Sequence, residues 1–252
     1  MLSGERQREL LRHMRSRGAG NVNDLAESIG VSPSTIRRDL REMDQLGLLT
    51  RVHGGASLPE ADVENTLTAR LGEHDIEKRR IGVAAADLVE DGTTILITGG
   101  TSTEAMIPFL SERNGLTVVT NGLNIALQLS RHPAITVVVL GGILRHGELS
   151  LLGPLGEQML EEFDVQQAFI GAYGVDSKIG LSGASVHEAS TDRRLLQDLD
   201  SIAVLVDGSK FLQRGPVRLA KVEQITTLIT DPSAPDDEVA AFRESGVDVR
   251  LV

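Results

Sequence analysis

The chain has 252 residues, of which 40% are hydrophobic, 24% charged and only 2% aromatic. This length suits one large domain or two smaller ones. The scarcity of aromatic rings argues against a protein that reads single-stranded nucleic acid by base stacking. The sequence has no cysteine, which excludes disulfides, thiolate metal sites and cysteine nucleophiles.

The first residues lead directly into a charged segment, so we expect no secretory signal. The most apolar stretch, residues 134–144, has 11 residues and is too short to span a bilayer. These features predict a soluble, cytoplasmic protein that makes no membrane contact.

Charge is distributed unevenly along the chain, whose formal net charge is −11. Residues 1–57 carry nine arginines and seven acidic residues, whereas the remaining 195 residues carry 16 basic and 29 acidic ones. Because the acidic part repels nucleic acid, any contact with DNA has to come from the N-terminal part. The alternative is that the arginines form an ordinary solvated helix face with no role in DNA binding.

Three short helices are predicted near the N-terminus, over residues 5–15, Val22–Ile29 and Pro33–Leu46. A break at Arg17–Gly20 separates the first two. Gly30 follows the second helix at a position where the left-handed conformation is common. The pair Ser32-Pro33 marks the start of the third helix, with an N-cap hydroxyl followed by proline at the first helical position.

The third helix has two opposite stripes. One is apolar, with Ile36, Leu40 and Met43, and the other is polar, with Ser34, Arg38, Arg41 and Gln45 and with Arg37 beside it. Two short helices joined by a tight turn, the second basic on its outer face, indicate a helix-turn-helix that reads the major groove.

The run Leu48–His53 is extended, has a basic tip and is ended by Gly54-Gly55, which is typical of a β wing. Arginine reads guanine edges, and serine or threonine near a helix start can take a phosphate or a base edge. The alternative is a three-helix packing unit without a ligand. The candidate DNA-binding residues are Ser32, Ser34, Thr35, Arg37, Arg38, Arg41, Arg51 and His53.

These N-terminal motifs resemble the DeoR-type bacterial transcriptional regulators. The resemblance is carried by the run Val31–Leu40 (VSPSTIRRDL), by Gly47 and by the run Arg51–Ala56 (RVHGGA). It implies a DNA-binding winged helix-turn-helix over residues 1–57.

A hinge is predicted at Gly54–Asn65, which is small, polar and acidic. Beyond it the chain alternates strand and helix, which predicts a parallel α/β sheet. We therefore divide the chain into a winged helix-turn-helix domain (1–57), a linker (58–75) and an effector-sensing α/β domain (76–252).

The expected strands are Thr94–Thr98, Leu116–Thr120, Ile135–Leu140, Gln167–Gly171, Ser201–Val206, Thr226–Thr230 and Val247–Val252. The expected helices are Ile76–Val89, Thr103–Glu112, Leu123–Ser130, Gly156–Phe163, Val186–Leu199 and Pro235–Ser245. Continuous apolar strands such as Val137–Leu140 imply burial on both faces.

Several predicted strands end in residues that can hold a ligand, and in an open α/β sheet ligands bind at that edge. Gly99–Thr103 is a glycine- and hydroxyl-rich loop before a helix, which suits a phosphate without a Walker lysine. The strand ends that follow carry Thr120–Gly122, Gly141-Gly142, Gly171–Gly174 and Asp207–Lys210. Taken singly, such a loop can be a plain turn, and Asp207 and Lys210 can form an ordinary surface ion pair.

The same segments extend the resemblance to the DeoR-type sensor domain, which is similar to the pentose-phosphate isomerase, glucosamine-phosphate isomerase and CoA-transferase fold. The resemblance implies a phosphorylated sugar or related metabolite as effector, with the phosphate at the Gly100–Thr103 loop. Here the loop reads Thr-Ser-Thr, and Asp192 stands where the family usually has lysine, which leaves the anionic group of the ligand open. The candidate effector-binding residues are Arg70, Lys78, Gly100, Thr101, Ser102, Thr103, Asn121, Gly141, Asp207 and Lys210.

The combined prediction is a transcriptional regulator, a repressor, whose affinity for double-stranded operator DNA is controlled by a small-molecule effector. We expect no enzyme activity and no cofactor or metal, and we expect a homo-oligomer, either a dimer or a tetramer, because one helix-turn-helix is a small interface. One alternative is a sugar-phosphate isomerase with an appended DNA-binding module and Asp207 or Glu188 as base. Another is a helix-turn-helix regulator with a different phosphosugar sensor of the sugar-isomerase type. The effector, the operator, the sign of control and the oligomeric state stay open.

Overall fold

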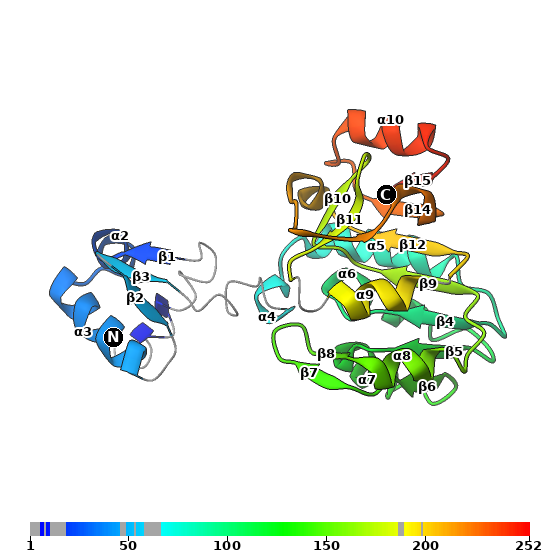
Figure 1. Ribbon diagram of the computed structural model, residues 1–252, viewed down its shortest axis with the longest axis horizontal. Coiled ribbons are helices and arrows are strands. Elements are labelled where there is room, and N and C mark those ends of the chain that lie inside the picture. Colours follow the sequence, from blue (N-terminus) through cyan, green and yellow to red (C-terminus); the bar gives the residue numbers. More distant parts are fainter. Residues whose placement is uncertain are drawn as a thin grey trace. The chain divides into compact units, whose positions relative to one another are not determined.

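The computed structural model describes residues 6–7, 9–10, 19–45, 49–52, 54–57, 67–185, 189–197 and 199–252 (Figure 1). The chain divides into two compact units, Met1–Arg70 and Leu71–Val252. The second unit carries the large parallel sheet and the flanking helices.

Among its described residues, the first unit packs α2 and α3 against a small antiparallel sheet, and residues 6–7 and 9–10 of the predicted first helix are also helical. Its elements are β1 (Ala19–Asn21), α2 (Val22–Ile29), α3 (Pro33–Gln45), β2 (Thr50–Val52) and β3 (Gly55–Ser57), with strand order β1-β3-β2. The three residues of the predicted apolar stripe of α3 are fully buried, together with Leu25. The predicted winged helix-turn-helix is therefore confirmed. Strand β1 was missed, since Arg17–Gly20 was interpreted only as a break.

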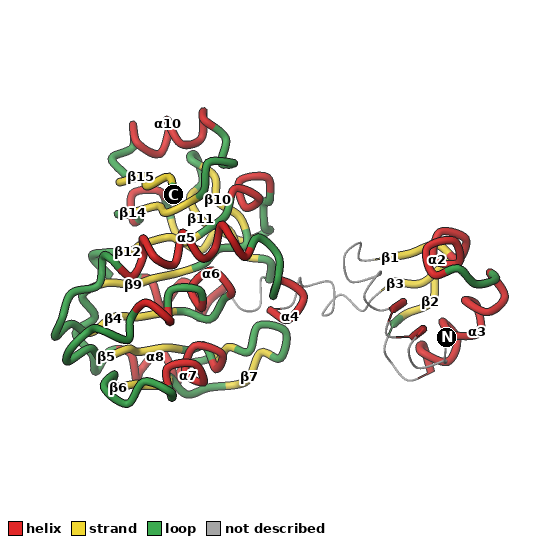
Figure 2. Tube along the Cα trace, turned by 180° about the vertical axis from the view of Figure 1, so that it is seen from behind, coloured by secondary structure: helices red, strands yellow, loops and turns green. Residues whose placement is uncertain are grey.

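A seven-stranded parallel sheet organises the second unit, in the order β15-β14-β12-β9-β4-β5-β6 (Figure 2). Its strands are β4 (Thr94–Ile97), β5 (Thr117–Thr120), β6 (Thr136–Val139), β9 (Gln167–Ile170), β12 (Ile202–Leu205), β14 (Thr227–Thr230) and β15 (Asp248–Leu251). Every pairing is parallel. All seven predicted strands are present within one or two residues of the expected bounds, and the predicted α/β fold class is confirmed.

Helices cover both faces of this sheet. The helices are α5 (Asp75–Ala86), α6 (Thr101–Glu104), α7 (Leu123–Leu129), α8 (Pro154–Leu160), α9 (Ala189–Leu196) and α10 (Asp236–Glu244). A four-residue helix, α4 (Leu67–Arg70), ends the first unit. Helices α5 and α7 share one hydrophobic cluster with the sheet, whereas α9 and α10 share the other.

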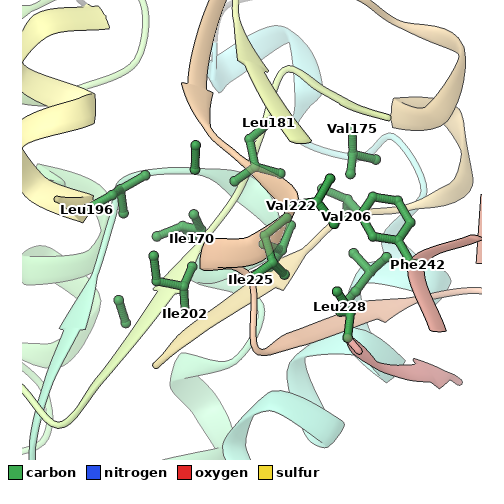
Figure 3. Close-up of a cluster of buried hydrophobic side chains, with 14 of the residues drawn as sticks. Ile170, Val175, Leu181, Leu196, Ile202, Val206, Val222, Ile225, Leu228 and Phe242 are labelled. Atoms are coloured by element: carbon green, nitrogen blue, oxygen red, sulfur yellow. The ribbon is translucent and has the colours of Figure 1, made fainter. Parts of the chain in front are cut away.

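Successive residues of the central strands alternate between the two clusters, as a pleated strand requires. Leu96 belongs to one cluster, and its neighbours Ile95 and Ile97 belong to the other. Figure 3 shows part of the cluster that contains Leu96, where Leu228 and Val206 lie beside Phe242 of α10. Both faces of the sheet interior are therefore buried.

Two small antiparallel sheets were missed because their strands are short. They are the hairpin of β7 (Ile143–Arg145) with β8 (Ser150–Leu152), and a sheet of β10 (Gly174–Asp176), β11 (Gly180–Gly183) and β13 (Val217–Ala220). The described part of this unit also contains the short 3₁₀ helices η2 (Ile107–Phe109), η3 (Gly208–Leu212) and η4 (Val222–Gln224).

Two predictions were wrong. The expected helix Thr103–Glu112 is instead the single turn α6 followed by η2, because Pro108 removes a backbone donor and restricts the residue before it. The apolar run around β6 was expected to be buried on both faces. In the sheet β6 is an edge strand, and Val139 is 37% exposed. Within the described residues, no helix is long and apolar enough to cross a membrane.

Candidate functional site

Local capping interactions define both ends of α2 and the start of α3. The Asn21 side chain accepts from the backbone nitrogens of Asn23 (2.8 Å) and Asp24 (3.0 Å), which caps the start of α2. Gly30 ends α2 with φ of 74°, in the left-handed region. The hydroxyl of Ser32 accepts from the backbone nitrogen of Thr35 at 3.2 Å and so caps α3.

A hydroxyl cluster therefore marks the start of α3. Ser32 Oγ lies 2.8 Å from Ser34 Oγ and 2.8 Å from Thr35 Oγ1. Ser32 and Ser34 are exposed and Thr35 is half-buried, so this end of the helix presents polar groups to solvent. It is the end that enters the major groove in helix-turn-helix proteins.

The outer face of α3 is strongly basic. Arg37, Arg38 and Arg41 are all exposed. The acidic residue among them, Asp39, is buried and forms a partly buried ion pair with Arg6, Nε to Oδ2 at 2.5 Å. That hydrogen bond raises the pKa of Arg6 above its usual range. The inward pairing of Asp39 leaves the outer face positive.

A hydrogen bond from the backbone nitrogen of Arg51 to Asp44 Oδ1, at 3.2 Å, ties the wing to α3. The Arg51 side chain is exposed on β2. His53, the other predicted wing residue, lies outside the described residues. Gly55 of β3 has no room for a side chain, since a Cβ there would lie 2.2 Å from the Gly20 carbonyl oxygen.

In the second unit, the strand order reverses between β4 and β9. The chain runs from β4 through β5 to β6 on one side and then returns to β9 on the other side of β4. Ligands of open α/β sheets bind at such a switch point, beyond the carboxyl ends of the strands. The Gly99–Thr103 loop leaves β4 at this point, and Gly171–Gly174 leaves β9 next to it.

The loop after β4 is held by its neighbour β5. Gly99 N donates to Asn121 Oδ1 at 3.2 Å, and Thr103 Oγ1 donates to the Thr98 carbonyl oxygen at 2.8 Å. A Cβ on Gly122 would lie 2.6 Å from Gly99 Cα, so the two backbones pack together without room for a side chain. Asn121 and the three hydroxyl residues 101–103 are all buried in this structure.

A carboxylate pair lies at the ends of β12 and β14. Asp207 Oδ1 accepts from Ser209 N at 3.0 Å, and Asp231 Oδ2 accepts from Gly208 N at 2.7 Å. Burial acts to raise the pKa of Asp231, but hydrogen bonds from Ser233 and Gly208 together outweigh it and hold this pKa below its usual value. Asp207 is 1% exposed, and its Oδ2 accepts no hydrogen bond from any described residue. Lys210 is buried in η3, in the turn that follows Asp207.

The remaining predicted effector residues are placed differently. Lys78 is buried in α5, and its Nζ donates to the Glu73 carbonyl oxygen at 2.6 Å. Arg70 ends α4 in the first compact unit, and its role in effector binding stays a prediction. Gly141 follows β6, two strands from β4 and four from β12. With strands about 4.8 Å apart, Gly141 and Asp207 are roughly 19 Å apart along the edge, too far for one small metabolite.

Comparison with known proteins places this architecture in a family. Residues 6–62 match the model of the DeoR-like helix-turn-helix domain, and residues 73–232 match that of the DeoR C terminal sensor domain. The chain belongs to the DeoR family. It is a DNA-binding transcriptional regulator and not an enzyme.

Individual relatives cover the chain end to end. The HTH-type transcriptional repressor CsqR of Escherichia coli is 31% identical over 246 residues, 98% of this chain and 94% of that protein. The glycerol-3-phosphate regulon repressor of Escherichia coli is 28% identical over 251 residues, the whole of both chains. Among solved structures, a ribose 5-phosphate isomerase from Methanocaldococcus jannaschii matches with a TM-score of 0.40 and 21% identity, over 53% of this chain and 52% of that one.

Three polar residues of the sensor edge were not among the predicted effector-binding residues. Asn124 donates to the Gly100 carbonyl oxygen at 3.3 Å and Ser150 is buried beside Gly99, while Asp231 holds the turn after β12. Asp231 directly follows a predicted strand, which is the signal that marks it. Ser150 carried no such signal, because its strand β8 was not predicted. Among the described residues no cluster of three metal-ligating side chains occurs.

Proposed function

We propose that this regulator is a repressor whose operator affinity is set by a phosphorylated sugar, or a related sugar-derived metabolite, bound at the carboxyl edge of the sensor sheet. The observation that carries the proposal is the buried Oδ2 of Asp207, which accepts no hydrogen bond from the described residues and lies at the same sheet edge as the Gly99–Thr103 loop. A buried carboxylate oxygen without a donor is costly, and a sugar hydroxyl is a suitable donor.

The two groups suit the two ends of such a ligand. Strands β4 and β12 are separated only by β9, so their ends lie about 10 Å apart. That spacing matches a phosphate at residues 100–103 and hydroxyls at Asp207 and Lys210. The glycerol-3-phosphate regulon repressor, a full-length relative, has a phosphorylated metabolite in its name, which supports a phosphorylated effector here.

DNA recognition is assigned to the predicted residues of the first unit. Arg38 and Arg41 on the outer face of α3 would read base edges and phosphates, and Arg51 on the wing would contact the backbone. One such helix covers a single half-site, so a homo-oligomer that places two helices about 34 Å apart is the expected form on DNA. The effector can change DNA affinity only to the extent that it binds the DNA-binding state and the other state of the protein with different affinity. This coupling free energy is typically 1–3 kcal/mol.

A thermal-shift screen of sugar phosphates, sugar sulfonates and sugar acids against the full-length protein tests the effector class, because a ligand of the native state raises its melting temperature. A sugar phosphate should give the largest shift, and Asp207→Asn should reduce that shift with DNA binding unchanged. An exposed acidic residue outside the sheet edge, Asp237, provides the matched control variant Asp237→Asn. A full shift with Asp207→Asn, or a shift with sugar acids alone, would contradict the proposal.

A further inference from the structure

A groove with a volume of about 890 Å³ lies between the β7–β8 hairpin, α8 and α9. This volume is within the range of small-molecule sites. None of the ten predicted effector residues lines it, so it is separate from the Gly100–Thr103 loop and from Asp207. We propose that this groove binds the phosphate group of a small phosphate monoester.

The charge of the groove is opposite to that of its surroundings. Residues 71–252 contain 15 lysines and arginines against 26 aspartates and glutamates, a net charge of −11. The groove lining instead contains three arginines, Arg145, Arg193 and Arg194, and one acidic residue, Glu157. The lining is therefore net positive, the sign that suits a phosphate monoester, which carries about −1.5 to −2 at neutral pH.

The walls of the groove are held in place by hydrogen bonds between its elements. Thr191 Oγ1 on α9 donates to Glu157 Oε1 on α8 at 2.9 Å and accepts from Gly153 N at 3.1 Å. Thr191 is buried. These bonds join α9 to α8 and to the turn before it, and the groove between them is lined by arginines of both α9 and the hairpin.

Arg193 is the best placed of the three arginines to receive a ligand. Its Nε donates to the Ala189 carbonyl oxygen at 3.1 Å, which orients the guanidinium, and neither of its Nη atoms bonds another residue of the described chain. Arg194, in contrast, is paired with Glu161 at 2.5 Å. An oriented guanidinium with two free nitrogens suits the paired oxygens of a phosphate.

The other lining residues suit the carbon skeleton of the ligand. Ile143, Leu152 and Pro154 give the groove an apolar wall. The hairpin also reaches the sheet edge, because Ser150 of β8 pairs with Gly122 and lies against Gly99. A ligand in the groove would therefore contact the same hairpin that covers the proposed effector site, which links the two sites physically.

The test is a ³¹P NMR titration of inorganic phosphate with the full-length protein, with line broadening as the readout. Wild type should show two classes of bound phosphate, and Arg193→Ala should lose one of them, with affinity at that site weakened at least tenfold. Arg131→Ala removes an exposed arginine outside the groove and should bind as wild type. Melting temperatures of the variants confirm that each is folded, and Arg193→Lys, which keeps the charge but loses the paired donors, should bind with intermediate affinity.

A second variant separates this proposal from the proposed function. Ser102→Asp places a carboxylate in the loop after β4 and should remove only the sheet-edge phosphate. If Ser102→Asp abolishes all phosphate binding and Arg193→Ala leaves it unchanged, the sheet edge is the phosphate site and the groove is not. If Arg193→Ala abolishes all binding and Ser102→Asp none, the groove proposal holds and the placement of the effector at the sheet edge fails. Arg193→Ala with wild-type binding overturns the groove proposal.

Discussion

Arg6 and Asp39 are 33 residues apart and form a two-point ion pair beneath the basic face of α3. Arg6 Nε donates to Asp39 Oδ2 at 2.5 Å and Nη2 donates to Oδ1 at 3.0 Å. Asp39 lies between Arg38 and Arg41 in the sequence and is 2% exposed. The pair therefore fixes the rotation of α3, and with it the direction in which the neighbouring arginines point.

Replacing Asp39 by asparagine should loosen this arrangement. The Arg6 guanidinium would lose its charged partner, so we expect a lower melting temperature of the first unit and DNA binding weakened by about tenfold. Fluorescence anisotropy with operator DNA and thermal unfolding of the full-length protein measure the two effects. Glu42→Gln changes an exposed carboxylate on the same helix and should have little effect. Wild-type DNA affinity in Asp39→Asn would show that the ion pair does not orient the helix.

Arg38 tests the reading of bases by the outer stripe of α3. Arg38→Ala should cost about 1–3 kcal/mol of operator binding and relax the sequence preference, because a bidentate arginine contact discriminates between bases. Footprinting and competition with random duplex report the two effects. Arg131→Ala in the second unit is the matched arginine control. An unchanged footprint and unchanged preference would exclude Arg38 from base recognition.

Gly122 tests the packing that holds the loop after β4. Gly122→Ala would place a Cβ 2.6 Å from Gly99 Cα, and relief of that clash requires movement of backbone. We expect a loss of about 1–3 kcal/mol in the free energy of unfolding, measured by urea titration. Gly141→Ala is the control, since a Cβ there meets nothing within 4 Å. Equal stability of the two variants would show that the loop adapts freely.

Asp231 gives a pH dependence with a definite sign. Its pKa is lowered in the folded state, so its ionised form stabilises the fold above the ordinary carboxyl pKa of about 3.9, and this contribution is lost as the pH falls through the folded-state value. Asp231→Asn should therefore be less stable than wild type at neutral pH, and the difference should shrink in acid. Asp237→Asn should show no such convergence. A stability difference that does not change with pH would contradict the assignment.

The parts of the fold that follow local rules were predictable from the sequence. The caps at Gly30 and Ser32, the apolar stripe of α3 and the seven parallel strands each have a signal within a few residues. The short hairpins had none, because strands of three residues are too brief to show a period. Burial of β6 was predicted wrongly, since its apolar residues do not reveal that the strand lies at the edge of the sheet.

The candidate sites show the same division. The exposed arginines of α3 and the glycine-rich loop after β4 follow from sequence, because strand ends and helix faces are local features. Partners that are far apart in the sequence cannot be predicted from it in this way. The Arg6–Asp39 pair and the contact of Ser150 with Gly99 join segments that only the fold brings together. The arginines of the groove come from β7 and α9, and nothing in their spacing predicts that they share one space.

The most direct test of the account is a measurement of DNA affinity with and without the metabolite. A selection from random duplexes with the full-length protein first identifies the operator, and anisotropy at fixed ionic strength then gives its affinity. The account predicts a clear preference for the selected sequence over random duplex, and a loss of affinity of roughly 5–150-fold when the sugar phosphate found by thermal shift is added. Equal affinity for selected and random DNA, or an operator affinity that no sugar phosphate changes, would contradict it.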